Sequence, residues 1–176
     1  DVYKRQDKRN LALLSEHADS DRFDAEERQV IERHIPWSRL VREGETTFEG
    51  RTVDLLPFLE AERERFVLKP PLDRGGRGVA MGPAVTAQQW RATLDEALAA
   101  DDWLVQEWIV SRTYLERWGE DGVDAGAWLQ DRVWGPFTWG DRFAGALLRQ
   151  QPVSTRRPIN ASLGEATLGT ALEVEA

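Results

Sequence analysis

The chain has 176 residues, of which 41% are apolar and 31% are charged, and its formal net charge is −8. This length can bury the core of one domain, and the composition is typical of a soluble globular protein. The acidic balance argues against a nucleic-acid partner or an anionic membrane surface. The chain has no cysteine, which excludes disulfides and Cys-bound metals and fits a reducing, cytoplasmic location. No apolar run approaches the about 20 residues of a membrane-spanning helix.

The first six residues, Asp1 to Gln6, resemble the translated end of a sequencing adaptor. Segments of this kind are set aside before a fold is considered. We therefore expect the natural sequence to start after residue 6. We also expect the chain to be a fragment that is truncated at its N-terminus.

Helix signals dominate the chain up to residue 64. Asp24 is a typical N-cap, and it predicts a helix that runs to about His34 and ends before Pro36. The other elements expected in this part are a helix over 7–18, extended and irregular chain over 37–52, and a helix over 53–64.

Short apolar strands dominate the rest. Thr86 and Gln89 match a capping box, which predicts a helix over 85–100. The other expected elements are strands over 66–69, 79–81 and 104–110, a hairpin of 134–137 and 143–149 that turns at Gly140-Asp141, and a loop-rich tail. Residues 111–130 are ambiguous. This order of elements predicts an α+β fold with a mostly antiparallel sheet.

Lys69 ends the strand 66–69 and is the only lysine after position 8, where arginine otherwise supplies the permanent positive charge. Lysine is a compact point charge, whereas arginine is a wide planar fork. A point charge at a strand end, beside exposed backbone N–H groups, suits a nucleotide phosphate. Lys69 therefore predicts an ATP site.

A glycine-rich turn follows Lys69. Gly75, Gly76 and Gly78 permit positive φ angles, and successive N–H groups in such a turn can bind an anion. The pattern matches neither a P-loop nor a dinucleotide fingerprint, so a plain hairpin turn is the alternative. Asp73 abuts the turn, either as a Mg²⁺ ligand or as the residue that caps the loop.

The strand after the long helix contains Gln106, Glu107 and Ile109. An adenine ring needs a backbone donor and acceptor between apolar walls, and the end of this strand could provide them. The alternative is a half-buried structural strand.

Arg149 ends an apolar strand, where its guanidinium could hold a phosphate or a substrate carboxylate. A surface arginine is the alternative. Asn160 is a further candidate Mg²⁺ ligand, with a turn asparagine as the alternative.

Several motifs occur together in one order. They are Val67-Leu68-Lys69-Pro70, Asp73, Gly75-Gly76-x-Gly78-Val79, the helix from Thr86, Val105-Gln106-Glu107, Gly135-Pro136-Phe137, Gly145, Arg149, Asn160-Ala161-Ser162 and the upstream Arg33-His34-Ile35-Pro36-Trp37. This order resembles the C-terminal half of circularly permuted ATP-grasp proteins, which include glutathionylspermidine-synthase-like and eukaryotic-type glutathione-synthetase-like ligases. The resemblance covers about residues 8–165. Its upstream segment, Arg33-His34-Ile35-Pro36-Trp37, resembles a segment that precedes the lysine strand in bacterial members.

The resemblance implies an ATP-grasp-like fold and the ATP-binding portion of a carboxylate–amine ligase. It divides the chain into the adaptor-like segment 1–6, a helical lead-in region 7–64, a nucleotide-binding portion 65–170 and a tail 171–176. ATP and Mg²⁺ are the implied cofactors, and a small-molecule or peptide carboxylate and an amine are the implied substrates.

The resemblance also implies a role for each candidate residue. Lys69 would touch the phosphates under a lid formed by Gly75, Gly76 and Gly78. Asp73 and Asn160 would bind Mg²⁺. The adenine would be bordered by Gln106, Glu107 and Ile109. Arg149 would hold the acyl phosphate. Further Mg²⁺ ligands of the family lie upstream in its members, so we expect this fragment alone to be inactive.

Two other functions stay open at this point. One is a non-catalytic nucleotide-binding or assembly module that keeps the same fold. The other is a structural α+β domain in which the glycine turn is only a turn.

Overall fold

The computed structural model describes residues 4, 6–73, 75–120, 123–153, 158–159 and 166–169, with the backbone alone for 116–120, 123–125 and 169. The chain divides into two compact units, 1–109 and 110–176. Within the described residues the fold is α+β, with four α-helices and three antiparallel sheets. No helix in these parts is long and apolar enough to cross a membrane.

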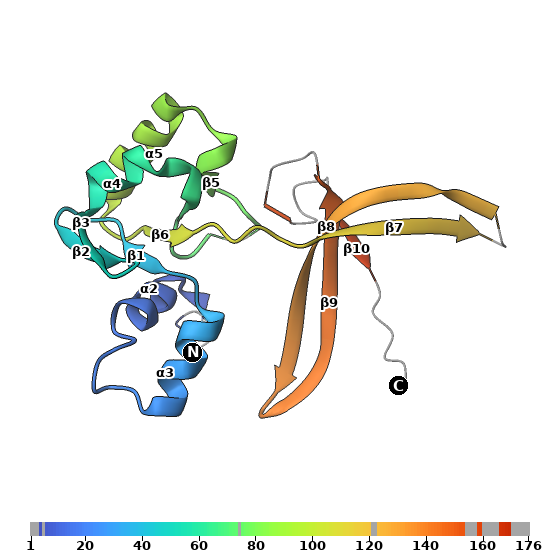
Figure 1. The fold of residues 1–176 in the computed structure, drawn as a ribbon, viewed down its shortest axis with the longest axis horizontal. Coiled ribbons are helices and arrows are strands. Elements are labelled where there is room, and N and C mark those ends of the chain that lie inside the picture. Colours follow the sequence, from blue (N-terminus) through green and yellow to red (C-terminus); the bar gives the residue numbers. More distant parts are fainter. Residues whose placement is uncertain are drawn as a thin grey trace. The chain divides into compact units, whose positions relative to one another are not determined.

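The first unit is built around a four-stranded sheet with the order β1-β6-β4-β5, in which every neighbouring pair is antiparallel (Figure 1). The two outer strands are short, and β6 lies inside the sheet between β1 and β4. The strands of this sheet are β1 (Ser38–Leu40), β4 (Phe66–Lys69), β5 (Ala80–Met81) and β6 (Leu104–Glu107). A separate hairpin pairs β2 (Glu45–Phe48) with β3 (Arg51–Asp54).

Helices cover both faces of this sheet. Figure 1 shows α4 and α5 on one side of it and α2 and α3 on the other. The helices are α2 (Arg9–Glu16), α3 (Ala25–His34), α4 (Leu55–Ala61) and α5 (Ala87–Ala100), with 3-10 turns at Arg63–Arg65 and Gly82–Ala84. Helices α3 and α5 begin at capping boxes made by Asp24 with Glu27 and by Thr86 with Gln89.

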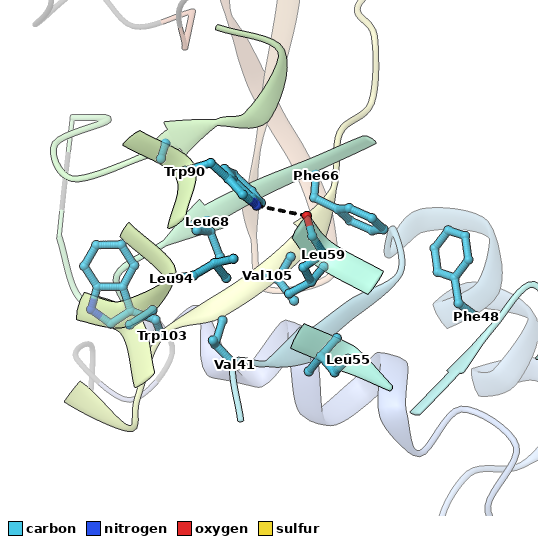
Figure 2. Close-up of a cluster of buried hydrophobic side chains, with 12 residues drawn as sticks. Val41, Phe48, Leu55, Leu59, Phe66, Leu68, Trp90, Leu94, Trp103 and Val105 are labelled. Carbon is cyan, nitrogen blue, oxygen red and sulfur yellow. Dashed lines mark hydrogen bonds between the residues drawn. The ribbon is translucent and has the colours of Figure 1, made fainter. Parts of the chain in front are cut away.

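The hydrophobic core lies between the sheet and the helices α4 and α5 (Figure 2). Phe66, Leu68 and Val105 point into it from the sheet, because alternate residues of a strand share a face. Trp90 of α5 is buried among them, and its indole Nε1 donates a hydrogen bond to the carbonyl of Leu59 at 2.9 Å, the dashed line in Figure 2. This bond joins α5 to the end of α4 inside the core.

The second unit is an antiparallel meander with the strand order β10-β9-β8-β7. The long strands β8 and β9 turn at Gly140, whose φ is +64°. A bulge interrupts their pairing after Pro136. The strands are β7 (Thr113–Glu120), β8 (Val123–Trp139), β9 (Arg142–Pro152) and β10 (Thr167–Gly169).

Most of the expected elements are present. The hairpin of 66–69 with 79–81, the helices at 24–34 and 85–100 and the turn at Gly140-Asp141 are confirmed, with small shifts at their ends. The strand expected over 104–110 is shorter and ends at Glu107. The ambiguous stretch 111–130 is β7 and the first part of β8.

The helix expected over 53–64 was wrong in its bounds. Val53 pairs with Thr46, and Asp54 pairs with Glu45, so these two residues extend β3 before α4 begins at Leu55. Strand pairing with β2 takes precedence here over the local helix signal. The expected lead-in region 7–64 thus holds three strands as well as helices, and one of them, β1, belongs to the sheet of Lys69.

Candidate functional site

Lys69 lies at the end of β4, on the sheet face opposite to the hydrophobic core. Strand alternation places it with Val67, whereas Phe66 and Leu68 point into the core. The side chain is half-buried, and burial lowers the pKa of its ammonium group. The positive charge of Lys8 lowers this pKa further.

The Lys69 ammonium donates a short hydrogen bond to Oε1 of Gln106. Gln106 lies on the neighbouring strand β6, directly opposite Val67 and diagonal to Lys69. The amide nitrogen Nε2 of Gln106 donates to Oγ of Ser38 on β1 at 2.9 Å, and Ser38 Oγ donates to the carbonyl of Pro36 at 2.9 Å. Ser38 is fully buried and Gln106 is 7% exposed, so this chain of hydrogen bonds crosses the interior of the sheet.

Lys8, at the N-cap of α2, holds the segment that follows Lys69. Its Nζ donates to the carbonyls of Pro70, Pro71 and Asp73 at 3.1, 3.3 and 2.6 Å. Its backbone N–H also donates to the Pro71 carbonyl at 3.1 Å. Burial lowers the pKa of Lys8, while the nearby carboxylate of Asp73 acts in the opposite direction. We name this set of contacts the Lys8 clamp.

The glycine turn has the backbone that the sequence predicts. Gly75, Gly76 and Gly78 have φ angles of +70°, +78° and +67°, which L-residues with a side chain rarely adopt. At Gly78 a Cβ atom would also lie 3.0 Å from Cγ of Pro70 and 3.4 Å from Oδ2 of Asp73. The turn therefore folds back closely onto the segment that the Lys8 clamp holds.

Asp73 is exposed at the start of this turn. Within the described residues no three His, Cys, Asp or Glu side chains gather where they could hold a metal ion. The second candidate ligand, Asn160, lies outside the described residues. Mg²⁺ is commonly bound by one or two carboxylates together with the phosphates of a substrate, and the single exposed carboxylate of Asp73 is compatible with that pattern.

The candidate adenine-binding segment is the end of β6 and the residues after it. Glu107 donates its N–H to the Trp37 carbonyl at 2.8 Å, and Trp108 donates its N–H to the Arg65 carbonyl at 2.8 Å. The Glu107 carboxylate is 3.5 Å from Nη2 of Arg65. Ile109 follows the strand and is 61% exposed. These two backbone donors are engaged within the fold, so they are not open to a base.

Arg149 belongs to the second unit, in the middle of β9. It pairs with Val133 of β8 and with Leu168 of β10. Its Nη2 atom would lie 3.4 Å from a Cβ built on Gly135, so that glycine leaves room for the guanidinium. Its Nε atom is buried and has no hydrogen-bond partner within the described parts of the chain.

A separate groove of about 350 Å³ lies along α4 and α5, away from Lys69. Arg91 and Glu60 line it and pair with each other through hydrogen bonds of 2.9 to 3.1 Å. Arg63, which also lines it, donates to the carbonyls of Gly82 and Val85. The charges that line this groove thus serve the packing of the helices, and we place the candidate site at Lys69.

Comparison with known proteins finds no matching family model and no matching curated protein.

Sequence reasoning missed two parts of this arrangement. Nothing in the sequence around Lys8 indicates its role, because the carbonyl groups that it contacts are more than 60 residues further along the chain. Ser38 likewise contacts Gln106 only because the sheet brings their strands together. A serine in an extended segment two residues after Pro36 can be seen in the sequence, but it does not indicate this contact.

Proposed function

We propose that this chain is the ATP-binding portion of a carboxylate–amine ligase of the circularly permuted ATP-grasp type. The observation that carries the proposal is the position of Lys69. Lys69 ends a strand with its ammonium group half-buried, and a turn with three positive-φ glycines begins a few residues later. A second ammonium group, that of Lys8, lies close enough to lower the pKa of Lys69.

This arrangement favours an anion for an electrostatic reason. Burial lowers the pKa of both ammonium groups, and the positive charge of Lys8 lowers that of Lys69 further, so an anion beside Lys69 would favour its charged form. Backbone N–H groups of a glycine turn add further donors for phosphate oxygens. A nucleotide phosphate is a ligand class that suits the Lys69 ammonium, the positive charge near it and such a turn.

The expected reaction transfers the γ-phosphoryl group of ATP to a carboxylate, and an amine then displaces the phosphate to form an amide. Its products are the amide, ADP and phosphate. In such a reaction Mg²⁺ would neutralise charge on the phosphates, and the exposed carboxylate of Asp73 would hold it. This chain would bind and orient the nucleotide, mainly through Lys69 and the turn.

Thermal unfolding with and without Mg-ATP tests the proposal. A nucleotide at 100 times its Kd would stabilise the wild type by about 2.7 kcal/mol, which is a rise of several degrees in Tm. The Lys69→Ala variant should lose this rise, whereas Lys4→Ala, which removes a lysine outside the site, should keep it. An unchanged Tm of the wild-type protein in millimolar Mg-ATP would refute a nucleotide site on this chain.

A second measurement separates the ligase from a non-catalytic nucleotide-binding module. Release of ADP when carboxylates and amines are added supports the ligase, and it would reject the module.

A further inference from the structure

The side-chain amide of Gln106 is held in one orientation. Ser38 uses its only hydroxyl proton on the Pro36 carbonyl at 2.9 Å, so its oxygen can only accept from Gln106. The amide group must then point its NH₂ toward Ser38 and its oxygen toward Lys69. A buried serine thereby decides which end of the glutamine the lysine meets.

We propose that Gln106 is a positioning residue for Lys69, and that Ser38 fixes it in that role. The pair holds the ammonium group at the end of β4 with an acceptor that carries no charge. This inference rests on the proposed function for its purpose, since the ammonium is held for an anion. It gives the Gln106 side chain a different task from the adenine contact that the sequence suggests.

An uncharged acceptor has a specific advantage at this position. A carboxylate in place of the amide would form an ion pair with Lys69 and compete with a phosphate for the same charge. An apolar side chain would leave a half-buried ammonium without this partner, which penalises its charged form. The amide orients Lys69 and leaves its charge available to a ligand.

Four substitutions in this chain separate positioning from general stability. Ser38→Ala removes the hydroxyl that fixes the amide, without touching Lys69. Gln106→Met removes the acceptor, and Gln106→Glu replaces it with a charged one. Ser15→Ala is the matched control, because its hydroxyl oxygen accepts from Ser38 N and from Arg39 Nη1, both at 3.0 Å, and is not part of the chain that leads to Lys69.

The readout is the titration of Lys69, followed by NMR of its Hε and Cε signals without nucleotide. The chain has three lysines, so few signals need assignment. Lys8 is the charged group that acts on Lys69, and its own signal reports whether that neighbour has changed. Urea unfolding of each variant shows whether it is folded.

We expect the Lys69 midpoint to move to lower pH in Ser38→Ala and Gln106→Met, to move to higher pH in Gln106→Glu, and to stay at its wild-type value in Ser15→Ala. A wild-type midpoint in both Gln106 variants would overturn the proposal. An equal displacement in Ser15→Ala and Ser38→Ala would also overturn it, because the effect would then be one of general packing. If Ser38→Ala does not fold, the opposite shifts of the Lys69 midpoint in the two Gln106 variants still decide whether Gln106 positions Lys69.

Mg-ATP affinity, measured on the same variants, keeps this inference separate from the proposed function. A loss on the order of tenfold in Ser38→Ala, with Ser15→Ala unchanged, supports both. Displaced Lys69 midpoints without Mg-ATP binding by any protein, wild type included, would support the positioning role and refute the nucleotide site.

Discussion

Replacing Lys8 with methionine should release the segment between Lys69 and the glycine turn while leaving the core intact. The ammonium group of Lys8 donates to three carbonyls of this segment, those of Pro70, Pro71 and Asp73. A hydrogen bond from a charged donor contributes about 1.5–3 kcal/mol, and the exposed end at Asp73 reduces this. We take about 1–2 kcal/mol for the Lys8 clamp, which corresponds to a factor of about 5–30 in the opening equilibrium of the segment.

Amide hydrogen exchange measures this opening directly. In Lys8→Met the N–H of Val79, which donates to the carbonyl of Gly76 at 3.4 Å and so closes the glycine turn, should exchange about 5–30 times faster than in the wild type, because it exchanges through the open state. The change in Tm should be small, because the desolvation that lowers the pKa of Lys8 also disappears with the charge. Lys4→Met is the control and should leave this rate unchanged. Wild-type exchange at the glycine turn in Lys8→Met would refute the view that Lys8 holds it.

Three further predictions concern stability. Trp90→Phe should lower the free energy of unfolding by about 2–4 kcal/mol, seen in urea denaturation, since it removes a buried hydrogen bond and part of a buried ring. Gly82→Ala should prevent the first unit from folding, because its Cβ would lie 1.7 Å from the carbonyl oxygen of Arg63. A Cβ at Gly140 meets no atom within 4 Å, so Gly140→Ala should lower the free energy of unfolding by only about 1 kcal/mol, for its φ of +64°. Circular dichroism distinguishes the two variants. Burial lowers the pKa of Lys69 in the folded protein below its ordinary value of 10.5, so just below pH 10.5 the unfolded chain binds more protons than the folded protein. The free energy of unfolding of the wild type should therefore rise relative to that of Lys69→Met as the pH increases toward 10.5. A flat or falling difference in urea denaturation would contradict this.

Local signals predicted the local structure well. The capping box of Thr86 and Gln89 involves residues three positions apart, and it fixed the start of α5. The glycine turn also depends on conformations that individual residues permit, and Gly75 and Gly78 adopt them. Such features are encoded within a few residues and need no knowledge of the rest of the chain.

The parts that sequence reasoning missed depend on pairing across long stretches. Val53 belongs to a strand because Thr46 lies opposite it, and no helix propensity reports that. Lys8 and Ser38 acquire their roles from partners more than 60 residues away. A fold-level template would be needed to foresee these contacts, since the residue types alone are compatible with an exposed surface.

The position of β6 inside the sheet has a consequence for the order in which the first unit can assemble. Strand β1 is synthesised early, and in the described sheet it pairs with β6. The paired residues Leu40 and Leu104 are 64 positions apart in the chain. Strands β4 and β5 can pair at once as a local hairpin, and they then present an open edge until β6 arrives. Because closing such long loops is slow, the sheet should complete late, and a nascent chain that stalls before residue 104 would expose both edges to association with other chains.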